Sequence, residues 1–137
     1  MHSATNSLPN GLKFTFLIAA IGGLAFAVSS LAIPDVIASL SGLPGKDLPV
    51  YQQAGGAVLG YTVGAFLMWR AANWEQIRIA LLAALTFTAL SALGALYYVV
   101  LKGVVTGALV VVMLYSIFLT LAYAYYWWKQ SSRGETK

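Results

Sequence analysis

The sequence predicts an all-α integral membrane protein, a four-helix bundle with antiparallel up-down-up-down topology. The first observation is composition. Of the 137 residues, 60% are apolar and 9% are charged, whereas soluble domains have about half and about a quarter. The second is that apolar residues form four runs, each close to or longer than the roughly 20 residues that cross a bilayer. The predicted spans are 14–33, 51–69, 74–101 and 104–128, between polar tails at 1–13 and 129–137.

The first predicted span begins after Lys13 and stops before Pro34, a residue that fits poorly inside a helix. A basic flank, an apolar run and Ala25-Phe26-Ala27 also resemble a signal peptide with its cleavage site. We expect an uncleaved membrane helix, because its length matches the hydrocarbon thickness.

The connection 35–50 contains four residues that break regular structure, Gly42, Pro44, Gly45 and Pro49. Before them, Val36, Ile37 and Leu40 have the spacing of one helical face. A short interfacial helix capped by Asp35 is one interpretation. We favour the other, a loop tethered by these three apolar side chains.

The second predicted span contains Gly56, Gly60 and Gly64 at a spacing of four. Glycines with this spacing share one helical face and form a groove for a neighbouring backbone. Similar small-residue repeats include Gly23 in the first span and Gly107 in the fourth. We expect these glycines to pack helices together. The Gly56–Gly64 face points either into the bundle or toward another protein, and we favour the internal use.

The third and fourth spans have local end signals. Asn73 followed by Gln76 is a capping-box pattern, and Glu75 suits the positive end of the helix dipole. Glu75 and Arg78 form an i, i+3 pair. Lys102-Gly103 supplies a cation and a glycine where the third span should end.

Charge predicts the orientation. In a four-span chain, two cations lie on one side, Lys46 and Lys102, and six lie on the side of the termini: Lys13, Arg70, Arg78, Lys129, Arg133 and Lys137. The positive-inside rule then puts both termini in the cytoplasm. We expect a multi-pass protein of the bacterial inner membrane. The net charge is +4, but the basic residues are scattered at the ends of the predicted spans and form no basic patch. We therefore expect no nucleic-acid partner.

Several kinds of chemistry lack the residues they need. The sequence has no cysteine, and its single histidine is His2 in the tail, so we expect no metal, haem or other cofactor ligand in the spans. No Asp, Glu, Lys or Arg falls in the middle of a predicted span. Proton relays and charge-selective pores depend on such residues, and we expect no catalytic activity from this chain alone.

The polar side chains inside the spans are mainly hydroxyls. Counting from the helix ends places most of them near the midplane, where they could line a cavity for a quinone head group or another neutral ligand. The candidate ligand residues are Tyr61, Thr88, Ser91, Tyr115, Ser116 and Thr120, with Thr62 and Tyr123 nearby. The alternative, which we favour, is that Ser and Thr bond their own i−4 carbonyls and Tyr bonds a neighbouring helix.

Spacing of Gly, Pro and apolar residues gives the chain a family resemblance. The first span closes in Ala32-Ile33-Pro34, the second opens with Gly55-Gly56 and runs through 59–70, and the third starts near Trp74. In this the chain resembles the small DoxX-like four-helix membrane proteins. That resemblance implies a membrane subunit of quinone-coupled oxidation.

Two functions therefore remain open. The first, which we favour, is a non-catalytic accessory or scaffold subunit that packs through glycine faces against other transmembrane subunits or against itself. The second is a DoxX-like subunit that binds a quinone or another lipid-soluble ligand at the midplane hydroxyls.

Overall fold

The computed structural model describes residues 7–42 and 47–134, which are helical apart from short connections. The helices are α1 (Asn10–Ala32), α2 (Pro34–Ser41), α3 (Leu48–Arg70), α4 (Trp74–Leu96) with its π-helical continuation η1 (Tyr97–Leu101), and α5 (Gly107–Gly134). The predicted all-α class is confirmed. Three described segments are long and apolar enough to cross a membrane, Asn10–Ala32, Trp74–Leu101 and Gly107–Ser132, and they indicate a membrane protein.

The fourth predicted span, in α3, differs from these three. With 23 residues α3 is as long as α1, but it is not among the segments apolar enough to cross a membrane. Gln52, Gln53 and its glycines lower its mean hydropathy. The prediction of four apolar spans is therefore supported for three of them.

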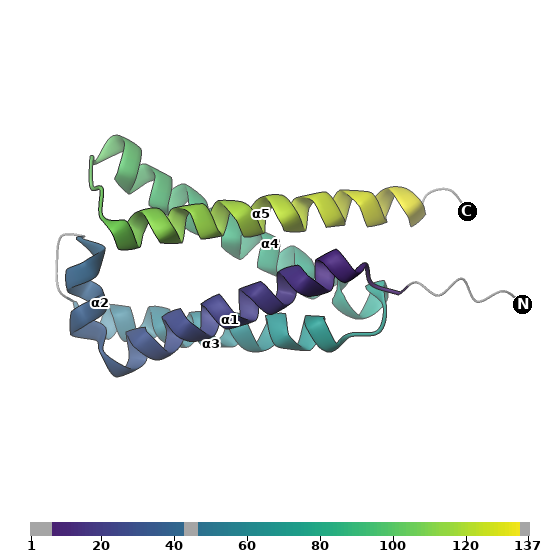
Figure 1. Ribbon diagram of the computed structural model, residues 1–137, viewed down its shortest axis with the longest axis horizontal. Coiled ribbons are helices and arrows are strands. Elements are labelled where there is room, and N and C mark those ends of the chain that lie inside the picture. The colour runs from purple at the N-terminus through teal and green to yellow at the C-terminus, as the bar shows by residue number, and fades with distance from the viewer. Residues whose placement is uncertain (1–6, 43–46, 135–137) are drawn as a thin grey trace, which may run out of the picture.

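The four long helices lie lengthwise and form two antiparallel pairs (Figure 1). α1 packs mainly against α3, and α4 packs mainly against α5, while contacts between the pairs are sparser. The start of α1 and the end of α5 lie at the same end of the molecule, and α2 lies at the opposite end (Figure 1).

α1 and α3 approach each other through small residues. Ala19, Gly23 and Ala27, the repeat of four in the first span, are all buried. A Cβ added at Gly23 would collide with Thr62 Oγ1 of α3, and one added at Gly55 would lie 3.2 Å from the Ala27 carbonyl oxygen. These glycines therefore allow backbone contact between the helices.

The large core side chains lie at the end of the molecule that holds the start of α1. Phe16, Leu12, Ile77 and Leu81 are fully buried there with Tyr123, whose ring centroid is 5.7 Å from that of Phe16. Leu8 is also buried, and Ser7 forms a β-bridge with Asn73. The predicted tail at 1–13 is therefore wrong for residues 7–13, and residues 1–6 lie outside the described chain.

The connection 35–50 begins as a helix, so the loop prediction is wrong there. Pro34 occupies the first turn of α2, where its fixed φ suits a helix and its missing N–H costs nothing. Asp35 lies in the first turn and does not cap the helix, which ends at Gly42 with φ 65°. Ala38 is buried. Residues 43–46, with Pro44 and Gly45, lie outside the described chain.

Two predicted features at the start of α4 are confirmed. The Asn73 side chain caps α4 by accepting a hydrogen bond of 3.2 Å from the Gln76 N–H, although Gln76 Oε1 accepts from the Ala72 N–H and not from that of Asn73. The pair of Glu75 and Arg78 is also present, 3.5 Å apart and exposed.

α5 differs from the predicted fourth span at both ends. It begins at Gly107 because Gly103, with φ 65°, ends the preceding helix and Thr106 Oγ1 accepts from the Leu109 N–H at 3.2 Å. It continues to Gly134, so residues 129–134 of the predicted tail are helical. Residues 135–137 lie outside the described chain.

Adjacent glycines of α3 give a matched test of the α1–α3 contact. Gly55→Ala should destabilise the protein by about 1–3 kcal/mol through overpacking, because the added Cβ would lie 2.9 Å from Ser30 Cβ. Gly56→Ala meets open space and should be neutral or stabilising by up to about 1 kcal/mol. Thermal unfolding of both variants in one detergent measures the difference, and equal stabilities would contradict this packing.

Candidate functional site

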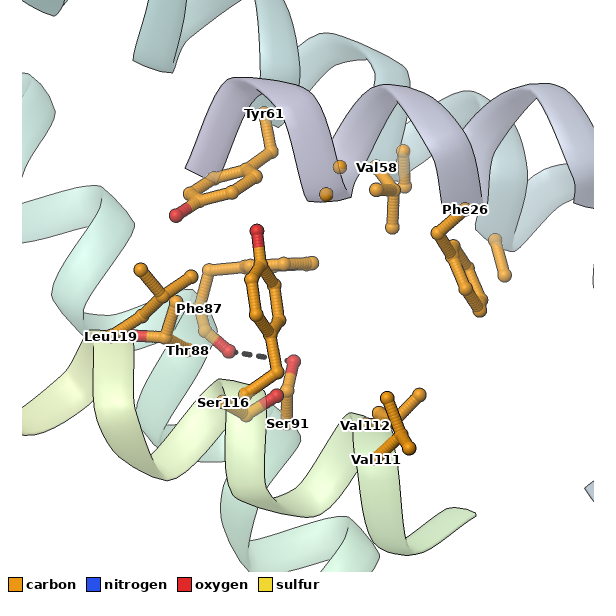
Figure 2. Close-up of a pocket in the computed structure, with 15 residues that line it drawn as sticks. Phe26, Val58, Tyr61, Phe87, Thr88, Ser91, Val111, Val112, Ser116 and Leu119 are labelled. Carbon is orange, nitrogen blue, oxygen red and sulfur yellow. Dashed lines mark hydrogen bonds between the residues drawn. The ribbon is translucent and has the colours of Figure 1, made fainter. Parts of the chain in front are cut away.

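A cavity of about 590 Å³ lies between the two helix pairs and is lined by all four long helices. In Figure 2, Phe26, Val58 and Tyr61 lie along one side of it, and Val111, Val112 and Ser116 lie along the other. The walls are mostly apolar and carry no charged side chain. An uncharged, largely apolar molecule is the kind of ligand such walls accept.

Tyrosine hydroxyls connect the helix pairs beside the cavity. Tyr61 Oη on α3 lies 3.0 Å from Tyr123 Oη on α5. Tyr115 of α5 donates to the Ile18 and Ala19 carbonyls of α1, each at 3.2 Å. Gly22 leaves room for this contact, since a Cβ there would lie 2.7 Å from Tyr115 Cζ. These hydrogen bonds hold α5 against α1 and α3.

Most of the smaller hydroxyls bond within their own helix. Thr88 donates to the Ala84 carbonyl at 3.0 Å, Ser91 to the Phe87 carbonyl at 2.8 Å (Figure 2), and Thr120 to the Ser116 carbonyl at 2.7 Å. The Ser116 hydroxyl differs, because it makes no hydrogen bond within the described residues although Ser116 is only 6% exposed.

Five of the six candidate ligand residues line this one cavity: Tyr61, Thr88, Ser91, Tyr115 and Ser116. Thr120 is not part of the lining, and Tyr123 lies in the core behind Tyr61. The apolar part of the lining, which includes Phe26, Phe87 and Gly22, was not predicted from the sequence. The Gly22-Gly23 pair in the middle of α1 was the available signal, since it leaves space at the depth of the hydroxyls.

Within the described residues, the glycine face of α3 makes no close contact with a neighbouring helix. A Cβ at Gly56, Gly60 or Gly64 would meet no heavy atom within 4 Å, and the same holds for Gly107 of α5. Gly60 and Gly64 instead line a second hollow of about 310 Å³ between α3 and α4. α1 packs on the neighbouring face of α3, which carries Gly55 and Thr62. Whether the Gly56–Gly64 face serves packing inside the bundle or toward another protein stays a prediction.

Metal binding finds no support in the described part of the chain, where no three His, Cys, Asp or Glu side chains gather. The cavity offers hydroxyl groups and apolar surface, which suit hydrogen bonding to an uncharged molecule.

Comparison with family models, curated proteins and solved structures finds no match for this chain.

The tyrosine contact gives a test of how the helix pairs are joined. Tyr123→Phe removes the buried partner of Tyr61 and should lower the free energy of unfolding by about 1 kcal/mol. Tyr125→Phe is the control, because Tyr125 is exposed and accepts only from Lys129, at 3.2 Å, in the described structure. Unfolding by denaturing detergent compares the two, and an equal effect would contradict a structural role for Tyr123 Oη.

Proposed function

We propose that this chain is a membrane protein that binds an uncharged, lipid-soluble molecule between its two helix pairs. One observation carries the proposal: five hydroxyl-bearing residues from three helices share a cavity of about 590 Å³ with apolar walls. Ligand sites are typically clefts of about 300–1,000 Å³ with mostly apolar walls and a few placed polar groups.

The chemistry of the walls sets the class of ligand. A charged group would enter without a partner, because no Asp, Glu, Lys, Arg or His lines the cavity, and an unpaired charge at bilayer depth is strongly disfavoured. The cavity is not fully enclosed, which favours a ligand that arrives from the surrounding lipid. A quinone is one molecule of this class, and it is also what the DoxX-like resemblance implies. With no acid, base or metal ligand at the cavity, we propose binding without catalysis by this chain.

The proposal includes the membrane topology. α3 has 23 residues, and at about 1.5 Å per residue it is long enough for a hydrocarbon layer of roughly 30 Å. Its packing against α1 buries Gly55 and Thr62, whereas Gln52 and Gln53 stay exposed. We propose four spans as an up-down-up-down bundle, with both termini in the cytoplasm of a bacterium because of the excess of cations at that end.

A second function, an accessory subunit of a larger membrane complex, is supported by a separate observation. Among the described residues, no heavy atom lies within 4 Å of a Cβ added at Gly56, Gly60 or Gly64, and Gly60 and Gly64 border a hollow beside α4. Helices in lipid associate through such faces because small residues allow close backbone contact. A transmembrane helix of another subunit, or a second copy of this chain, could pack there while the cavity holds its ligand.

Filling the cavity tests the ligand function. Ala57→Phe places a ring in the lining and should abolish copurification of a small molecule, because the ring occupies the ligand's volume. Val63→Phe is the control on the same helix, since Val63 is exposed and outside the lining. Native mass spectrometry after mild extraction measures the bound mass. A wild-type protein that carries no molecule beyond ordinary phospholipid would contradict the proposal.

Filling the glycine face tests the subunit function. Gly60→Leu should dissociate any complex that packs on α3, because the side chain occupies the groove between helices. Gly94→Leu is the control, since Gly94 of α4 is also exposed with open space beyond it. Native mass spectrometry of protein purified from its own membrane at native expression level measures assembly size. Unchanged assembly in Gly60→Leu would exclude this face.

A further inference from the structure

The hydroxyls on the α4 and α5 side of the cavity differ in whether they can still donate a hydrogen bond to a ligand. Each Ser or Thr hydroxyl has one proton to donate and two lone pairs to accept with. Thr88 and Ser91 already donate to carbonyls of their own helix, at 3.0 and 2.8 Å. Toward the cavity, both can therefore act only as acceptors.

The Ser116 hydroxyl, in contrast, still has its proton to donate. Ser116 is 6% exposed and lines the cavity, and its Oγ makes no hydrogen bond within the described chain. Figure 2 shows Ser91 and Ser116 reaching the cavity from the facing helices α4 and α5. The Ser116 O–H is therefore still available to donate to an acceptor atom in the cavity. The α4 and α5 side of the cavity therefore offers the Ser116 O–H as a donor and the Ser91 and Thr88 oxygens as acceptors.

We propose that this side of the cavity recognises a ligand hydroxyl, which accepts from Ser116 and donates to Ser91. The inference rests on the proposed ligand function and narrows its ligand class. A ketone or an oxidised quinone can only accept, so it would use Ser116 and leave Ser91 and Thr88 without a donor. The hydroxyl of an alcohol, a phenol or a reduced quinone can both accept from Ser116 and donate to Ser91. The ligand is therefore an apolar molecule that carries an uncharged hydroxyl.

Three probes of equal chain length separate the contributions: 1-tetradecanol, 1-methoxytridecane and pentadecane. Native mass spectrometry of the full chain in lipid nanodiscs gives the occupancy of each at equal concentration in the membrane. We expect the alcohol to bind about tenfold more tightly than the alkane, the effect of one to two net hydrogen bonds. The ether should bind less tightly than the alcohol, because it accepts but cannot donate.

Variants assign these differences to residues. Ser116→Ala should weaken binding of the alcohol and the ether by about fivefold and leave the alkane unchanged. Ser91→Ala should weaken only the alcohol, to the level of the ether. Thr86→Val is the control, because Thr86 is exposed on α4, donates to the Leu82 carbonyl at 3.0 Å and lies outside the lining.

The outcomes distinguish this inference from the proposed function. If all three probes bind equally well to the cavity, the hydroxyl preference is wrong and ligand binding stands. If no probe binds although a small molecule copurifies with the wild-type chain, the hydroxyl preference is wrong and ligand binding stands. If no probe binds and no small molecule copurifies, both are wrong. The ranking of probes on the wild-type chain decides the inference even if Ser116→Ala does not fold.

Discussion

The fold is built on the close contact between α1 and α3. Lipid supplies little hydrophobic force between helices, so association needs close packing of backbones. This close packing is possible because Gly23 of α1 contacts Thr62 of α3, and Gly55 of α3 contacts the Ala27 backbone of α1. This contact also holds the long helix that is least suited to lipid, because α3 carries Gln52, Gln53 and several glycines. α3 is therefore positioned mainly by its neighbour.

The cavity follows from uneven packing between the two helix pairs. At one end of the molecule, Phe16, Ile77, Leu81 and Tyr123 fill the space between the helices. Beyond them, the tyrosine hydroxyls join α5 to α1 and α3. Further along, small and medium side chains leave the space open. The tyrosines therefore stand where the filled part of the interior gives way to the cavity.

The candidate site could be predicted in part. Depth along a helix follows from residue number, because each residue advances about 1.5 Å, so Tyr61, Ser91 and Ser116 could be placed at one level before their directions were known. Their hydrogen bonds could not be predicted. Thr88 and Ser91 bond within α4, as Ser and Thr commonly do, whereas Ser116 finds no such partner. That difference decides which hydroxyl can donate to a ligand, and it depends on the local side-chain geometry.

Local features follow from the amino-acid sequence alone: the helical class, the apolar segments, the Asn73 cap and the helix end at Gly103. Which face of each helix lies inside depends on how the helices pack together. This packing places Gly55 against α1 and leaves Gly56, Gly60 and Gly64 open, and it buries Leu8. The physical reason is that a membrane helix is apolar on every side, so its sequence lacks the polar–apolar contrast that marks the buried face of a soluble helix.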